Sequence, residues 1–321
     1  MKKILFGLAF LLTVVQSALI DTSAKAQSPA TPLFNWGSDP ASQYWNVYIG
    51  GMYLKRSTPD SSAILTPPTG TPGILLNANS FDFDWKSLPE FAVQRKFDGG
   101  WMVEGRYFRT GTDSATNGLQ NITTFRVAGI GVTILGGGDL VNSYQSELRS
   151  VEFNVYKQLT PGLAVLAGYR SLNFQDHLHI GLVGTGLNIS DWKDQNRLNG
   201  AQIGLSLNLT SPAVPLLFNV TAKTGWYHNS IDHDFTSQIV SRASDNGSKT
   251  AQVSELNATA TYQVTNNLAL RAGYSLLWMN RVAIAGEAAP TTVQQPGGTA
   301  SPLATGNAWY QGATFGAVMS F

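Results

Sequence analysis

Apolar and polar side chains alternate with a period of two along much of the second half of the chain. Between Leu198 and Thr210 the odd positions are almost all apolar, and the even positions are glycine or polar. The same alternation recurs in 216–226, 256–264 and 268–278. A period of two is typical of β-strands with one apolar and one polar face. The pattern therefore predicts a series of long amphipathic strands.

These strands are near the 9–11 residues that a tilted transmembrane strand needs. Short turns alternate with long polar connections, as in a barrel that crosses a membrane. The short turns lie at 97–100, 160–162, 210–215 and 265–267, and the long loops near 56–79, 110–142, 178–195, 230–250 and 283–306. The sequence predicts an all-β, antiparallel, up-and-down transmembrane barrel of about ten strands (8–12) with the short turns on the periplasmic side. The expected strands are 45–55, 80–96, 100–109, 143–159, 162–176, 196–210, 215–229, 250–264, 267–282 and 307–321.

One further segment, from Ile122 to Leu135, has strand-like composition. We interpret it as a hairpin inside the long connection after Arg109. The alternative is that it crosses the membrane within an extra pair of strands, which would raise the count to 12. Single-chain bacterial barrels have an even number of strands, and both interpretations satisfy that rule.

The two ends of the chain indicate export and membrane assembly. Lys2 and Lys3 precede the apolar run 4–15, and Ala24-Lys25-Ala26 fits a signal-peptidase cleavage site. The run is shorter than the roughly 20 residues of a spanning helix. We expect residues 1–26 to be a signal peptide that is removed, 27–43 a flexible periplasmic lead, and 44–321 an outer-membrane barrel. The last strand alternates back from an aromatic end, Phe321, which resembles the signal read by the outer-membrane assembly machinery.

Composition narrows the class of protein. Charged residues make up 13% of the chain, against roughly 25% in soluble domains, and there is no cysteine. The formal net charge of +1 gives no basic field for nucleic acid. We expect no cofactor, no nucleic-acid partner and no cysteine-ligated metal. Aromatic residues near strand ends are expected at the membrane–water boundary, namely Trp101, Trp226, Trp278, Trp309, Tyr274 and Tyr310.

Three aromatic-rich segments, 81–85 (FDFDW), 100–108 (GWMVEGRYF) and 168–174 (GYRSLNF), carry a resemblance to a known family. In order and spacing they resemble the putative β-barrel porin-7 (BBP7) family and the related Legionella-type pore-forming outer-membrane proteins. The likeness extends loosely from about Tyr44 to Phe321. The resemblance implies an outer-membrane barrel that conducts solutes, and it implies no catalytic residues.

With the apolar faces toward lipid, a set of charged side chains faces the lumen. They are the acids Glu90, Glu104, Glu152 and Glu255 and the bases Arg106, Arg170, Lys223 and Arg271. One interpretation is a constriction that selects small hydrophilic solutes. The other, which we favour, is a structural network of ion pairs, because a ring of about 8 strands leaves room only for side chains while open porins have 16–18.

Two groups of residues offer candidates for other chemistry. His177, His179, His228 and His233 lie near carboxylates at the loop side and are weak metal candidates. A hydrolase at the barrel rim would use Asp82, Asp84, Asp176, His177, Asp232 and His233, but these residues do not form a recognisable motif. A serine hydrolase would need a Ser with a positioned His, and the sequence marks none.

The expected function is a small or gated pore for hydrophilic solutes, and not an enzyme. The alternative is a structural barrel that contacts an unknown surface partner through its long loops. A rim hydrolase is the least favoured of the three interpretations.

Overall fold

The computed structural model describes residues 45–130, 132–185, 187–210 and 216–321. The expected signal peptide, 1–26, and the expected lead, 27–43, lie outside the described residues. No described helix is long and apolar enough to cross a membrane.

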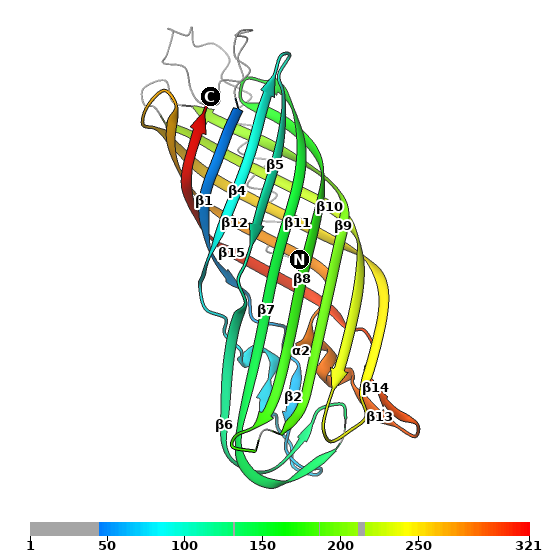
Figure 1. Cartoon of the computed structure of the whole chain (residues 1–321). Coiled ribbons are helices and arrows are strands. Elements are labelled where there is room, and N and C mark those ends of the chain that lie inside the picture. The colour runs from blue at the N-terminus through cyan, green and yellow to red at the C-terminus, as the bar shows by residue number, and fades with distance from the viewer. Residues whose placement is uncertain (1–44, 131, 186, 211–215) are drawn as a thin grey trace. The chain divides into compact units, whose positions relative to one another are not determined.

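In the described part of the chain, ten antiparallel strands close into a ring (Figure 1). The first and last strands of the ring pair with each other, and each of the others pairs with the preceding and following ring strand along the chain. This is the up-and-down barrel that the alternation predicts. The ring strands are β1 (Trp45–Arg56), β4 (Lys86–Phe97), β5 (Trp101–Arg109), β7 (Thr133–Thr160), β8 (Leu163–Leu182), β9 (Asn188–Thr210), β10 (Leu216–Thr236), β11 (Ala243–Gln263), β12 (Leu268–Ala283) and β15 (Thr305–Ser320).

Short connections gather at one end of the ring, which we call the turn end, at the top of Figure 1. The β4–β5 turn there contains Gly99 and Gly100, with φ of 73° and 75°. Two successive residues with positive φ favour glycine, which explains the Gly-Gly pair in this turn. Long connections gather at the opposite end, which we call the loop end.

The segment that looked strand-like at 122–135 spans the end of β6 (Asp113–Val127) and the start of β7. The two strands pair as a hairpin over the first part of β7 and add no further pair of strands to the ring. The register is interrupted near Asn121, whose φ is 55°. The interpretation of this segment as a hairpin is therefore confirmed, and the ring keeps ten strands among the described residues.

Two of the predicted long loops are wrong in extent. The strands β8 and β9, and likewise β10 and β11, continue through most of 178–195 and 230–250, and β7 reaches 28 residues. Their pairing is unbroken at the level of Trp192 and Phe235. Inward residues there are buried and include large apolar side chains such as Leu178, Trp192 and Phe235, while the outward residues are polar. Because these outward faces lie in water rather than lipid, the segments resemble polar loops in sequence.

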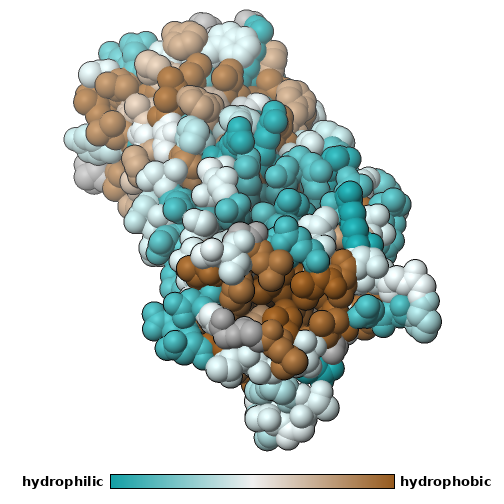
Figure 2. Space-filling model, turned by 60° about the horizontal axis from the view of Figure 1, so that its bottom comes forward, coloured by the Kyte–Doolittle hydropathy of each residue, from teal (hydrophilic) through white to brown (hydrophobic). Residues whose placement is uncertain are grey.

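Outward apolar side chains form a band around the ring near the turn end. Members include Ile49, Phe91, Val151, Phe153, Ile203, Leu205, Phe218, Leu270 and Phe315, all exposed. Figure 2 shows this band as brown at the far end, followed by a teal zone toward the viewer. Apolar side chains facing outward at this density fit a lipid environment, whereas a water-soluble barrel would bury them. Strand portions beyond the band extend past the membrane.

The prediction that Tyr310 lies at the membrane–water boundary is wrong. The Tyr310 side chain points into the barrel, is 2% exposed and bonds Ser146 at 3.0 Å between hydroxyl oxygens. The neighbouring Trp309 faces outward, and successive residues of a strand point to opposite faces. Trp101, Trp226 and Tyr274 are exposed on the outer surface, as expected.

The loop end of the barrel is filled by segments that do not belong to the ring. Residues 284–304, which we call the plug, carry α2 (Ala285–Ala288), η2 (Ala289–Thr291), β13 (Val293–Gln295) and β14 (Gly298–Ala300). The connection after β1 adds β2 (Ala63–Thr66), β3 (Leu76–Asn77) and η1 (Ala78–Ser80). Their apolar residues, with Phe81 and Phe83 from the same connection, form one buried cluster with inward residues of the ring such as Phe174, Trp192 and Phe235. The interior at this level is a packed core.

Candidate functional site: a charge cluster, a cavity and a plug

Six charged side chains meet inside the ring, and we call them the charge cluster. They are Glu90, Arg106, Glu152, Arg170, Lys223 and Glu255, each at an inward position of a different ring strand and each at most 8% exposed. Three acids and three bases balance in charge. Burying an ion costs several kcal/mol unless it is paired, so the cluster is stable only as a connected set.

Arg106 connects the cluster. Its guanidinium donates to Glu90 at 2.6 Å and to Glu152 at 2.8 Å. It also donates to Glu255. Strand β5, which carries Arg106, lies five places from β11, which carries Glu255, in the ring of ten. The contact therefore joins opposite walls, and side chains close the lumen at this level.

The other two cations complete the pairing. Arg170 donates to Glu255 at 2.6 Å and to the Ser150 hydroxyl at 2.9 Å. Lys223 bonds both carboxylate oxygens of Glu152, at 3.0 and 2.8 Å. These contacts satisfy the carboxylates from several strands at once.

Two predicted lumen residues lie inside the barrel but outside the cluster. Glu104 accepts hydrogen bonds from neutral donors only: Gln94 at 2.6 Å, Asn154 at 3.0 Å and Tyr156 at 3.0 Å. Arg271 makes no ion pair with any described residue, and its guanidinium lies 5.0 Å from the centre of the Tyr48 ring. All eight predicted charges thus face inward, and six of them meet.

Several neutral members of the site were missed at the sequence level. Gln202 donates to Glu152 at 2.8 Å and to Asn154 at 2.6 Å, and its own oxygen accepts from Tyr227. The same alternation that pointed to Glu152 places Asn154 on the inward face, so its orientation, though not its partners, could have been predicted. Spacing along a strand does not show which inward residues of different strands share a height.

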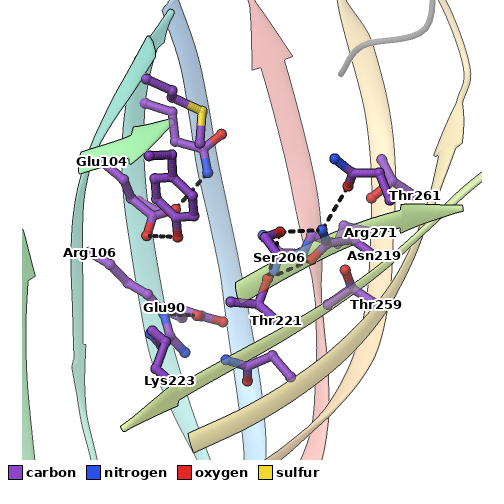
Figure 3. A pocket seen from close by; sticks show the side chains of 16 residues that line it. Glu90, Glu104, Arg106, Ser206, Asn219, Thr221, Lys223, Thr259, Thr261 and Arg271 are labelled. Atoms are coloured by element: carbon purple, nitrogen blue, oxygen red, sulfur yellow. Dashed lines mark hydrogen bonds and ion pairs between the residues drawn. The ribbon is translucent and has the colours of Figure 1, made fainter. Parts of the chain in front are cut away.

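A cavity of about 60 Å³ lies on the turn-end side of the cluster (Figure 3). Glu104, Arg106 and Glu90 line one wall, and hydroxyl and amide side chains with Arg271 line the other. On the second wall, Asn219 donates to Ser206 at 2.8 Å and to Asn208 at 2.7 Å. The lining is largely polar, and the volume holds a few water molecules or a small polar group.

Hydrogen bonds hold the plug in the mouth of the barrel. Asp176 accepts from Arg56 at 2.6 Å, from Tyr144 at 2.6 Å and from the backbone N–H of Ala285 at 3.0 Å. Burial raises the pKa of the Asp176 carboxyl, and Arg56 opposes that rise. Asn196 also bonds both the N–H and the C=O of Ala283, at 2.7 and 2.9 Å. The base of the plug is therefore fixed to ring strands.

A second anchor has the connectivity of a serine-hydrolase triad. His233 Nδ1 lies 2.6 Å from Asp194, and its Nε2 lies 2.7 Å from the Ser301 hydroxyl on the plug. Ser301 is only 4% exposed and also bonds Thr292 at 2.6 Å. Trp192 donates to the same threonine at 2.9 Å. With this burial and these partners, the chain of groups ties the plug to β9 and β10.

The histidines do not converge. His177 and His179 face outward and bond Asp191 at 2.9 and 3.3 Å, His228 is exposed on the outer surface, and His233 points inward. Burial alone would raise the pKa of Asp191, but the hydrogen bonds from His177 and His179 hold it below its usual range. Within the described residues, no three His, Asp or Glu side chains form a group that could hold a metal ion.

The rim-hydrolase residues are also separated. Asp82 pairs with Lys55 at 2.8 Å and is exposed, while Asp232 pairs with Arg197 at 3.1 Å on the outer face. Asp176 is buried inside. A shared water could not touch residues on opposite faces of the barrel wall, so this set does not form the predicted site.

Comparisons with known proteins agree with this architecture. No curated protein matches the chain. Among solved structures, the outer membrane protease OmpT from Escherichia coli matches with a TM-score of 0.52 at 10% identity, over 94% of this chain and 100% of that one. The Ralstonia pickettii toluene transporter TbuX matches with a TM-score of 0.36 at 12% identity, over 92% and 96%. At these identities the likeness to OmpT shows the barrel fold alone, and the likeness to TbuX carries no argument.

A family model covers most of the ring. The model described as "Putative beta barrel porin-7 (BBP7)" matches residues 103–321, which include most of β5 and every later strand of the ring. The Legionella-type resemblance is not tested by any match. The chain is an outer-membrane β-barrel protein that belongs to the BBP7 family.

Proposed function

We propose that the protein is a gated pore for small hydrophilic solutes, and that this structure is its closed state. One observation carries the proposal. The lumen is closed by side chains and by connecting segments, while the strand pairing of the ring is complete without them. A barrel closed in this way can open without breaking strand pairing. Membership of a porin-like family supports the same function.

Two barriers stand in series along the proposed path. The first is the charge cluster, which spans the ring through Arg106 and Glu255. The second is the apolar core under the plug, which excludes hydrophilic solutes. Passage therefore requires displacement of the plug and rearrangement of the cluster.

Planar-bilayer recording tests this function directly. Purified protein should give discrete conductance steps separated by long closed intervals, because the closed state is well packed. Silence across a wide range of voltages and pH would contradict the pore.

A second candidate function is a permanently closed barrel that acts through its loop end. A specific observation favours it: Leu135 and Val183 are 79% and 49% exposed near the loop end. Figure 2 shows an apolar patch at the near end of the molecule. In this case, shortening the 183–187 connection should abolish binding of a surface partner and leave an assembled, silent barrel.

The route to the membrane is part of the proposal. Residues 1–26 would direct export and be removed, and the strand ending at Phe321 would contact the assembly machinery before the band meets outer-membrane lipid. Sequencing the N-terminus of protein from outer membranes should give Gln27 as the first residue. A mature chain that retains Lys2 and Lys3 would contradict cleavage.

A further inference from the structure

Arg271 differs from the other lumen cations because no carboxylate pairs with it among the described residues. It faces inward on β12, opposite Thr261 of β11 and Gly316 of β15. It is partly exposed to the cavity rather than fully buried. The guanidinium lies 5.0 Å from the centre of the Tyr48 ring, and among the described residues its five N–H groups have no hydrogen-bond acceptor.

Other donors share this wall of the cavity. Thr259 and Thr261 line it, and their hydroxyls have no hydrogen-bond partner among the described residues. Figure 3 shows both threonines on the same side as Arg271 and Asn219. The wall therefore presents one cation and two free hydroxyls to the same small volume.

The acids near the cavity do not neutralise Arg271. Glu90, Glu152 and Glu255 are held by Arg106, Arg170 and Lys223 within the charge cluster. Glu104 lines the opposite wall, where it accepts hydrogen bonds from Gln94, Asn154 and Tyr156 and makes no ion pair with Arg271. The wall that carries Arg271 therefore has unused donors and a positive charge, and a ligand that binds to this wall must supply acceptors and negative charge.

We propose that this cavity binds a small oxyanion, with Arg271 as its principal contact and Thr259 and Thr261 as hydroxyl donors. A planar guanidinium recognises a carboxylate or phosphate oxygen pair with two parallel hydrogen bonds. A volume of about 60 Å³ admits the anionic group of a solute and not a large body. The inference rests on the proposed pore only in its claim that the anion lies on the path of a solute. A barrel that never opens could bind the anion equally well.

Isothermal titration of the full-length mature protein in detergent micelles tests the site, with inorganic phosphate and acetate as separate probes at constant ionic strength. At least one probe should bind the wild type. Arg271→Gln should weaken that binding at least tenfold, because it removes the charge and the paired donors. The affinity of Arg271→Lys should lie between those of the wild type and Arg271→Gln, and Thr261→Val should weaken binding a few-fold.

Arg242→Gln is the matched control. Arg242 pairs with Asp234 on the outer surface, away from the lumen, so its loss should leave anion binding unchanged. Wild-type protein that binds neither probe would overturn the proposal, and so would equal binding by wild type and Arg271→Gln. Should Arg271→Gln fail to fold, Arg271→Lys and Thr261→Val carry the test, and unchanged binding by both would overturn it.

Bilayer recording separates this inference from the pore itself. Binding that depends on Arg271 without any conductance would support the anion site and contradict the pore. Conductance steps whose reversal potential in a salt gradient is identical in wild type and Arg271→Gln, together with absent binding, would support the pore and contradict the site.

Discussion

At the scale of single residues, Glu255 is a carboxylate on which the charge cluster depends strongly. It accepts from Arg106 and Arg170, and both cations are almost fully buried. Glu255→Gln would leave two buried guanidinium groups with one fewer charge to balance them. We expect a loss of about 3–5 kcal/mol in the free energy of unfolding, measured by urea titration in micelles.

Glu147→Gln provides the control for this prediction. Glu147 bonds Arg109 at 2.7 Å, but the arginine is 55% exposed, so the pair should contribute about 1 kcal/mol or less. Equal losses in the two variants would show that the cluster is not the buried, interdependent network described above.

Asp113 gives a pH-dependent prediction at the same scale. It lies on β6, beyond the membrane band, and burial raises the pKa of its carboxyl to about 6. An acid whose folded pKa is raised favours folding below its unfolded pKa, near 3.8, and this contribution is lost as pH rises through 6. Asp113→Asn should therefore stabilise the protein by about 1 kcal/mol at pH 8, after allowance for solvent screening, and have little effect below pH 4. The same stabilisation at both pH values would contradict this assignment.

At the scale of elements, the plug depends on hydrogen bonds to the ring. His233→Ala removes the link between Asp194 and Ser301 and leaves both polar groups buried. An unsatisfied buried group costs about 1–3 kcal/mol. Amide hydrogen exchange in residues 288–301 should then quicken about tenfold or more, whereas exchange in the turn-end half of β10 should not change.

His228→Ala is the matched control for the plug. It lies on the same strand but is exposed on the outer surface. Two results would show that the Ser301 contact does not hold the plug: faster amide exchange in the plug after His228→Ala, or an unchanged exchange rate there after His233→Ala.

Elements also differ in how far the sequence could predict them. Alternation in β9 to β12 gave both the strands and their inward faces, because lipid and lumen impose opposite polarity on successive residues. It failed at 178–195 and 230–250, where the outer face lies in water and carries polar side chains, as a loop would. Asn154 and Gln202 were missed for a different reason: which inward side chains meet depends on the stagger between strands, which one strand's sequence does not contain.

At the scale of the whole molecule, the position of the membrane can be tested on one strand. Phe153 and Val141 both face outward on β7 and are 54% and 47% exposed, but only Phe153 lies in the apolar band. Phe153→Arg should cost about 2–4 kcal/mol of stability in lipid, and Val141→Arg close to none. Refolding into lipid vesicles with urea titration measures both, and equal costs would contradict a membrane confined to the turn-end half.

The central claim is that the plug closes a barrel that can conduct, and the absence of native cysteine allows it to be locked specifically. A Cβ built at Gly286 of the plug would lie 3.0 Å from the Cβ of Ala78 in η1, close enough for an engineered disulfide with a small adjustment. The measurement is single-channel conductance of the Ala78→Cys, Gly286→Cys double variant before and after reduction. We predict silence when the variant is oxidised and wild-type steps when it is reduced. Two results would contradict the claim that the plug closes a conducting barrel: identical conductance steps from the oxidised and the reduced variant, or no conductance from either form and none from the wild type.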